Sequence, residues 1–363
     1  MSQEAKKDTP VTIRDIAEKL HVSSVSVHRA LSGKEGVSDE LRARILKTSE
    51  EMGYQFNYAA SSIRKKQMRI AVVLPTDENV YYSYFWDGVH DCYNTMSSLN
   101  IVIDSFVCRN EKEQCDELKK IADQGGAYSG VLTFSYSRDQ SVLLQLQRLV
   151  AQGVATVVID DSIKEPDGIC NIPSHEKKIG EVAAQLVCLM TPEKGAVIVT
   201  EGRKDSVLHV NKLQSFVKYL KDHKPGIRPI VISGYYSPKQ NQITRDSILK
   251  AIHDNPDTVA CYALTSHDNS PMAEAVGMAG LNGKIRLIGS DLNVETRQLL
   301  ENERMDAVIN QGAYLKGYTG LKIIADHAVK NLEMPGNITI PIDVIFKSNL
   351  SCYDSSGAMT TRR

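Results

Sequence analysis

The chain has 363 residues, of which 42% are hydrophobic and 24% are charged. This length allows two or three domains, and this composition supports a folded core. No stretch approaches the roughly 18 to 20 continuous apolar residues that a membrane span needs. The start, MSQEAKKDTP, is polar and has no apolar signal region. We therefore expect a globular protein of the cytoplasm with no membrane partner.

The formal net charge of −1 averages two unlike parts of the chain. Residues 1–68 hold twelve Lys and Arg against nine Asp and Glu, which is +3 and leaves −4 for the remainder. A basic head on an acidic body suggests a nucleic-acid-binding module joined to another domain. The seven cysteines follow neither a CxxC pattern nor a zinc-like spacing, so we expect reduced thiols and no metal site.

The first 56 residues carry only helical periodicity. Thr12 is expected to cap a helix whose apolar residues fall at positions 13, 16, 17 and 20. Ser23 is expected to cap a second helix that ends at Gly33, and Ser38 to cap a third. Three helices in about 45 residues, with a short turn between the first two, predict a helix-turn-helix head.

The second of these helices has an unusual outer face. If Val27 and its apolar neighbours face the core, then a small mixed set faces outward, namely Ser24, Val25, His28 and Arg29. Such a face suits base edges in the DNA major groove, where Arg reads guanine and an apolar group meets the thymine methyl. The alternative is a solvated surface helix, which would not normally expose Val25.

From Arg69 onward, apolar strands alternate with amphipathic helices. The predicted strands are residues 69–75, 101–107, 130–136, 155–160, 195–200, 230–235, 259–264, 284–289 and 306–310. This alternation indicates parallel sheets, and nine strands exceed one ordinary sheet. We expect an N-terminal all-α helix-turn-helix head plus α/β, as two doubly wound parallel-sheet lobes. The predicted divisions are residues 1–56 (head), 57–68 (hinge helix and linker) and 69–363 (ligand binding and dimerisation).

Residues 11–64 resemble the DNA-binding head of the lactose-repressor family of bacterial transcription regulators. The resemblance is carried by TIRDIAEKLHVSSVSVHRALSG, then VSDELRARI, then MGYQFNYAASSI. It implies that Ser24, Val25 and Arg29 read bases, and that phosphates are contacted by Thr12, Ser26 and Ser38. His28 stands where the family usually has Ser or Thr, so it could read a base or a phosphate directly.

The linker also resembles that family, in which a short helix folds on DNA and inserts a leucine into the minor groove. Here Ile63 takes the place of the leucine, and a branched apolar wedge can still unstack a base step. The implied linker contacts are Asn57, Ala60, Ile63 and Arg64. The alternative for Arg64 and the two lysines that follow it is a solvated charge run.

The body resembles the type I periplasmic binding protein fold, in which two lobes are hinged around a ligand. The cues are NVYYSYFWDG, VVIDDS, NKLQSF, SHDNSPMAEAV, LIGSD and NQG, which come in the family's order. We expect the chain to cross between the lobes near residues 160–171, near Asp291 and near Ala325. Ligands of open α/β sheets lie beyond the carboxyl ends of strands. By the resemblance, the ligand-binding residues are Asn79, Tyr81, Tyr82, Asp160, Lys212, Tyr236, His267, Asp268, Asp291 and Gln311.

This residue set favours a sugar or sugar-like polyol. Aromatic rings stack on C–H faces, while carboxylates and amides take paired hydroxyl groups. Lys212 replaces an arginine and His267 an asparagine that are frequent in relatives, so the particular sugar stays open. Other readings are that Tyr81 packs in the hinge and that Asp291 is a capping residue. Trp86 is expected in the core.

The sequence therefore predicts a homodimeric transcription regulator, a repressor, that binds a pseudo-palindromic double-stranded DNA operator and responds to a small sugar or polyol effector. It contains no GxSxG, no P-loop and no GxGxxG at the required position, so we expect no enzyme, no catalytic residue and no cofactor. The alternative is a protein similar to a sugar-binding transport receptor, against which the basic head and the polar start argue.

Overall fold

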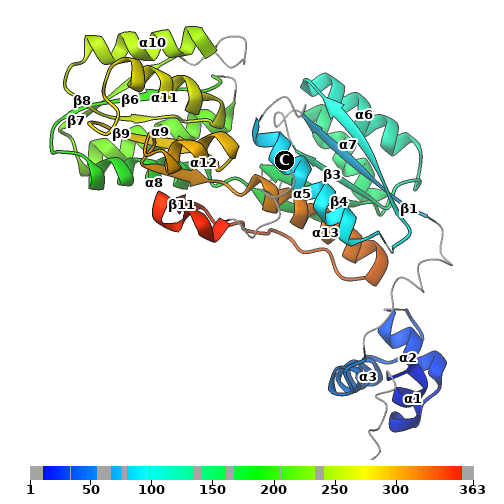
Figure 1. Ribbon diagram of the computed structural model, residues 1–363. Helices are drawn as coiled ribbons and strands as arrows, with labels where there is room; N and C mark the ends of the chain where they lie inside the picture. The colour runs from blue at the N-terminus through cyan, green and yellow to red at the C-terminus, as the bar shows by residue number, and fades with distance from the viewer. Residues whose placement is uncertain are drawn as a thin grey trace, which may run out of the picture.

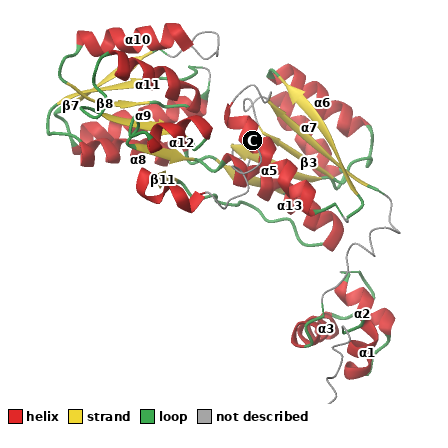
Figure 2. Ribbon diagram, in the orientation of Figure 1, coloured by secondary structure: helices red, strands yellow, loops and turns green. Residues whose placement is uncertain are grey.

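The computed structural model describes residues 11–32, 34–54, 67–75, 80–97, 99–134, 140–160, 167–204, 206–233 and 241–353. They form a head of three helices and two lobes in which helices flank a sheet (Figures 1 and 2). The predicted fold class is thereby confirmed. Several predicted site residues lie outside the described residues: Asn57, Ala60, Ile63, Arg64, Asn79 and Tyr236.

The head has the three predicted helices and the three predicted caps. The helices are α1 (Ile13–Leu20), α2 (Ser24–Leu31) and α3 (Asp39–Glu51). Thr12 forms a capping box, since its side chain accepts from the backbone of Asp15 while the Asp15 carboxylate accepts from the backbone of Thr12. Ser23 and Ser38 accept backbone N–H bonds at the starts of α2 and α3. His21, with φ of 53°, ends α1 in the left-handed conformation.

The head has a core of its own. Ile16 of α1, Val27 of α2 and Ile45 of α3 are fully buried and form one cluster. Each helix contributes one apolar stripe to this cluster, as the 3.6-residue period predicts.

Lobe 1 is a parallel sheet of five strands in the order β2-β1-β3-β4-β5 within the described residues. The strands are β1 (Met68–Pro75), β2 (Ile101–Cys108), β3 (Gly130–Phe134), β4 (Ala155–Asp160) and β5 (Ile169–Pro173). The flanking helices are α5 (Val80–Thr95), α6 (Glu111–Asp123), α7 (Gln140–Ala151) and α13 (Ala313–Lys330). Alternate residues of β1 enter opposite layers: Val72 packs with α5 and α13, whereas Val73 packs with α6 and α7.

Lobe 2 is a described sheet of six strands in the order β11-β10-β9-β8-β6-β7, in which only β11 runs antiparallel to its neighbour. The strands are β6 (Gly195–Thr200), β7 (Ile227–Ile232), β8 (Thr258–Tyr262), β9 (Arg286–Ser290), β10 (Ala307–Asn310) and β11 (Asp343–Ile345). The helices are α8 (Glu176–Met190), α9 (Val207–His223), α10 (Asn241–Asp254), η2 (Ser266–Asp268), α11 (Asn269–Met278), α12 (Val294–Glu301) and η3 (Lys347–Tyr353). β5 and β11 are not among the nine predicted strands.

The crossings between the lobes differ from the predicted positions. The first lies after β5, because this strand joins the sheet of lobe 1 before α8 begins in lobe 2. The second crossing was predicted near Asp291, and this prediction is wrong. α12 and β10 follow Asp291 within lobe 2, and the chain crosses only between Asn310 and α13. The third crossing was predicted near Ala325, which is also wrong, because Ala325 is buried in the core of lobe 1. Asn337 still forms a β-bridge with Asn171 of lobe 1, so the chain returns to lobe 2 between Asn337 and β11.

Helices α5 and α13 lie in close main-chain contact, side by side in Figure 1. A Cβ atom on Gly88 of α5 would collide with the carbonyl oxygen of Tyr314, and a Cβ atom on Gly317 of α13 would collide with that of Phe85. Glycine at these two positions lets the backbones approach. The helix of the second crossing is thus fixed against the first helix of lobe 1.

No helix in the described part of the chain is long and apolar enough to cross a membrane. The seven cysteines are all free thiols, and burial raises the pKa of Cys92 and Cys108 to about 12.

Candidate functional site

Helix α2 presents the outer face that the sequence predicts. Ser24, Val25 and Arg29 are exposed and His28 is half-buried, and the apolar residues on the opposite side of the helix are buried in the head. Val25 is 59% exposed, so its side chain is available to a partner surface. The Ser26 hydroxyl hydrogen-bonds the Ser23 hydroxyl at 2.9 Å and is half-buried. A base-reading role for this face stays a prediction.

A residue that sequence reasoning missed holds the carboxyl end of α2 in place. The guanidinium of Arg42, in α3, donates to the carbonyl of Ala30 at 3.0 Å and to that of Lys34. The carbonyl of Ala30 is in the last turn of α2 and that of Lys34 follows the helix, so the cation ties the end of α2 to α3 and complements the helix dipole. A basic residue at the start of the third predicted helix is the only sequence signal for this role.

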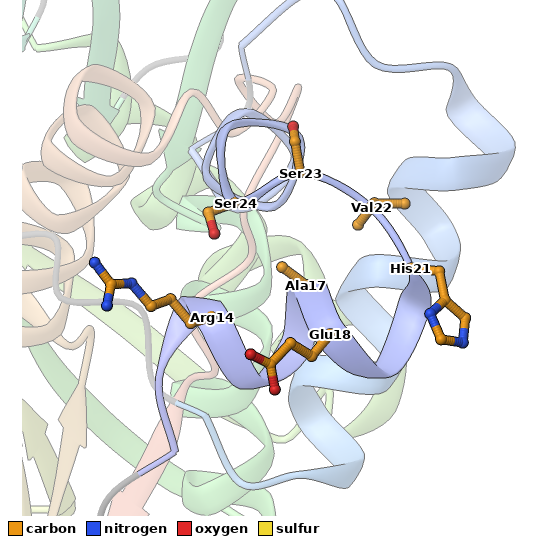
Figure 3. A pocket seen from close by; sticks show the side chains of 7 residues that line it. All are labelled: Arg14, Ala17, Glu18, His21, Val22, Ser23 and Ser24. Carbon is orange, nitrogen blue, oxygen red and sulfur yellow. The ribbon is translucent and has the colours of Figure 1, made fainter.

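A hollow of about 600 Å³ lies between α1 and the start of α2 (Figure 3). Figure 3 shows Arg14 and Glu18 of α1 on one side of it and Ser24 on the other. Its lining residues are Arg14, Ala17, Glu18, His21, Val22, Ser23 and Ser24. Arg14 and Glu18 therefore lie beside the predicted base-reading residue Ser24 and place one charge of each sign at this end of the face.

In lobe 1, three side chains meet at the carboxyl end of β4: Tyr81 and Asp160, which the sequence predicted, and Lys316, which it did not. The Tyr81 hydroxyl donates to Oδ1 of Asp160 at 2.8 Å. The Nζ of Lys316, from α13, donates to the same oxygen at 2.6 Å and to the Tyr81 hydroxyl at 3.0 Å. Burial, followed by the charge of Asp160, raises the pKa of Tyr81 well above its usual value, so the hydroxyl stays a donor. Sequence reasoning missed Lys316.

Aromatic rings lie next to Tyr81, and together with Tyr81, Asp160 and Lys316 they are called the wall of lobe 1. The ring of Tyr82 meets the ring of Tyr81 edge to face, with centroids 5.2 Å apart. It also lies 5.7 Å from the ring of Phe134 at the end of β3. Trp86, one turn further along α5, is buried in the core as expected.

In lobe 2, Lys212, Asp291 and Gln311 lie near the ends of β8, β9 and β10 and are called the wall of lobe 2. Asp291 accepts from Nε2 of Gln311 at 3.1 Å. Lys212 of α9 is 3% exposed and donates to the carbonyl of Leu264 at 3.1 Å. Burial lowers the pKa of Lys212 and raises the pKa of Asp291. The alternative role of Asp291 as a helix cap is wrong, because Asn293 caps α12.

The remaining predicted residues of lobe 2 lie in the loop after β8. Asp268 is buried and accepts hydroxyl hydrogen bonds from Thr200 at 2.8 Å and Thr265 at 2.7 Å. Burial raises its pKa. These bonds join the end of β6 to η2 and orient His267, which is half-buried beside Asp268.

Two observations connect the lobes near these residues. Burial lowers the pKa of Lys212, and smaller effects on this pKa come from Asp291 of the same lobe and from Lys316 and Asp160 of lobe 1. Across the lobes, the Tyr84 hydroxyl of α5 accepts a hydrogen bond from the backbone N–H of Val294, the first residue of α12, at 2.9 Å. Tyr81 and Asp160 of lobe 1 and Lys212 and Asp291 of lobe 2 are thus close enough for their charges to interact, and their role in ligand binding stays a prediction.

A helix-turn-helix head joined to an α/β domain of two lobes is the architecture of a ligand-controlled DNA-binding regulator. Residues 12–57 match bacterial regulatory proteins of the lacI family, and residues 70–332 match a periplasmic binding protein domain. The chain therefore belongs to the periplasmic binding protein domain family, and a lacI-type DNA-binding domain precedes that domain.

Similar proteins include catabolite control protein A of Priestia megaterium, 23% identical over 344 residues that cover 93% of this chain and 99% of that protein. The ribose operon repressor of Lactococcus lactis is 21% identical over 345 residues, covering 93% of this chain and 98% of the repressor. A solute-binding protein of Actinobacillus succinogenes, solved with bound D-allose, shares the fold with a TM-score of 0.69 at 14% identity, over 79% of this chain and all of that one.

Proposed function

We propose that the chain is a sequence-specific DNA-binding transcription regulator, acting as a repressor, whose operator affinity is controlled by a small sugar or polyol. The observation that carries this proposal is the pairing of an exposed mixed face on α2 with a buried polar site built from both lobes. The similarity over nearly the full length to a catabolite control protein and an operon repressor supports it.

In this proposal the head reads DNA through α2. Arg29 pairs with a guanine, Val25 meets a thymine methyl, and Ser24 and His28 hydrogen-bond base edges or phosphates. Thr12, Ser26 and Ser38, at or near helix starts, contact phosphates. Two heads of a homodimer bind the half-sites of a pseudo-palindromic operator, because protein and site share a two-fold axis. In the linker, Ile63 is the minor-groove wedge, flanked by Asn57, Ala60 and Arg64.

The effector lies between the two lobes. Tyr81 and Tyr82 offer aromatic faces, and Asp160 and Asp291 offer carboxylate oxygens from opposite walls. Gln311, Lys212 and His267 complete the polar lining, and Asn79 and Tyr236 extend it. Hydroxyl groups that project from different sides of a sugar ring would donate to carboxylates on both walls, which favours a sugar. Asp268 acts through the loop that it stabilises.

The effector controls DNA binding through the arrangement of the lobes. A ligand that contacts both walls favours the closed arrangement, and its effect on DNA affinity equals its differential affinity for the two arrangements, typically about 1 to 3 kcal/mol. The head spans residues 1–56, the hinge helix 57–68 and the sensor 69–363, and the homodimer acts in the cytoplasm without catalytic activity. A receptor for transport would not need the exposed face of α2.

The test combines a ligand screen with a DNA selection on the full chain. Thermal-shift measurements against a panel of sugars and polyols, including D-allose, should give a raised Tm with at least one compound, because a bound ligand stabilises by mass action. Selection from random duplexes should return a pseudo-palindromic site whose affinity this compound changes. A chain that prefers no duplex, with or without the compound, would refute the proposal.

A further inference from the structure

Lys316 is a buried ammonium group for which the proposed role of the pocket gives no reason. Its side chain is 2% exposed, and that of its partner Asp160 is 8% exposed, with 2.6 Å between Nζ and Oδ1. A buried ion pair of this kind does not by itself stabilise a fold better than apolar packing would. Other residues of α13, such as Leu321 and Ile324, enter the apolar core of lobe 1, so this helix is packed there without the ion pair.

The hydrogen bonds around Asp160 are one-sided. Both Tyr81 and Lys316 donate to Oδ1, and among the described residues no side chain donates to Oδ2. The carboxylate is held from one side by two donors, and its φ of 62° fixes its direction at the end of β4. The second oxygen is therefore a prearranged acceptor on the wall of lobe 1.

The charge of this acceptor decides what it binds. A buried carboxylate without a cation of its own attracts a cationic partner, whereas one already paired with an ammonium presents an acceptor with little net charge.

We propose that Lys316 is a specificity-determining residue that neutralises Asp160, so that the free oxygen Oδ2 accepts an uncharged hydroxyl group of the effector and an amino sugar is rejected. This inference rests on the proposed function, since it assigns a charge class to the effector of the same pocket. Lys316 acts through Asp160 and is a positioning residue for that acceptor.

The first part of the test uses the full chain without ligand. Lys316→Met keeps the length of the side chain and removes its charge, so the Tm should fall by several degrees because Asp160 is left buried and unpaired. Adding Asp160→Asn should restore most of the lost Tm, although Asp160→Asn alone should lower it. The matched control is Lys322→Met, on the same helix, where the pair with Asp326 is partly exposed and the Tm should barely change.

The second part measures affinity for neutral sugars, with D-allose, D-glucose and D-galactose as probes, against D-glucosamine and D-galactosamine. The wild-type chain should bind a neutral sugar better than an amino sugar, and Lys316→Met should shift this ratio toward the amino sugar by about tenfold. A purely packing role for Lys316 would lower both affinities equally.

The outcomes separate the two proposals. If Asp160→Asn does not rescue the Tm of Lys316→Met, the inference about Lys316 is wrong whatever the sugars do. An unchanged ratio of neutral to amino sugar in Lys316→Met overturns it as well. A wild-type chain that binds no compound of the panel of sugars and polyols overturns the proposed effector class, and with it the hydroxyl-accepting role, while the rescue still establishes the ion pair.

Discussion

Asp160 and Asp291 occupy equivalent positions in the two lobes: each stands at the carboxyl end of a strand, and their φ angles are 62° and 61°. Positive φ is uncommon for residues other than glycine and marks local strain that the surroundings maintain. Lys316 holds one carboxylate and Gln311 holds the other, and these two residues lie at the second crossing between the lobes. One short segment of the chain thus contacts both walls of the candidate pocket.

Replacing Asp291 by Asn should remove the response to sugar while DNA binding without sugar persists. Asn tolerates the left-handed backbone, so the loop should keep its conformation. The lost charge weakens the hydrogen bonds that a sugar hydroxyl would donate, by about tenfold or more in affinity. Calorimetric titration with the sugar found by screening checks the first part, and DNA binding of the ligand-free variant checks the second. Unchanged sugar affinity would remove Asp291 from the pocket.

The same substitution has an effect on stability that depends on pH. Burial raises the pKa of Asp291, so its contribution to stability is present at low pH and is lost as the pH rises through the raised value. Asn does not ionise. The ligand-free variant should therefore melt above the wild type at about pH 8, and the difference should shrink toward about pH 4. A difference in Tm that does not vary with pH would contradict the role of burial.

Replacing Arg29 by Ala should cost about 1 to 3 kcal/mol of operator affinity and relax the preference at one operator position. Arg29 is exposed on α2, so the head should remain folded. Affinities for a set of operator variants with single base changes give the measurement. Equal losses on every sequence would show that Arg29 contacts the DNA backbone and reads no base.

Arg42 offers a contrast within the same head. Arg42→Ala removes donors to the end of α2, and hydrogen bonds from a charged group contribute about 1.5 to 3 kcal/mol. The head should unfold at lower temperature, and DNA affinity should fall to the same extent on all sequences. Circular dichroism of the full chain, followed through the helical transition, tests this. A relaxed preference at a single base pair would instead place Arg42 on the DNA.

Replacing Tyr84 by Phe should favour the open arrangement of the lobes. The hydroxyl accepts the backbone N–H of Val294 across the two lobes, and a neutral hydrogen bond contributes about 0.5 to 1.5 kcal/mol. Sugar affinity should fall by the corresponding factor, and small-angle scattering should show a larger radius of gyration for the variant without ligand. The Tm should change little, because Tyr84 joins the lobes and is outside their cores.

The head is readily predictable from its sequence because the signals are local. Thr12, Ser23 and Ser38 are good caps in front of apolar stripes, and the structure confirms all three. Apolar runs in the sequence likewise predict nine strands of the lobes. The short strands β5 and β11 are not predicted, because their pairing depends on sheets already formed elsewhere in the chain.

The crossings and the ion pair are harder to predict because they depend on contacts between distant segments. No local sequence signal near Asp291 indicates that α12 stays in lobe 2 and that β10 pairs with β9 in the same sheet. Lys316 sits in an amphipathic helix, where a lysine usually faces water, and only its approach to Asp160, 156 positions earlier, reveals its role. Tyr84 and Val294 are 210 positions apart, so their contact has no sequence signature.

The glycines at the crossing of α5 and α13 determine how the first lobe can move. At Gly88 and Gly317 main chain meets main chain, so at these two points no side chain lies between the helices that could repack. We therefore expect α5 and α13 to move together, as one rigid part of lobe 1. A methyl group added at either glycine would push α5 and α13 apart. It would thereby displace Tyr81 and Tyr82 on α5 together with Lys316 on α13.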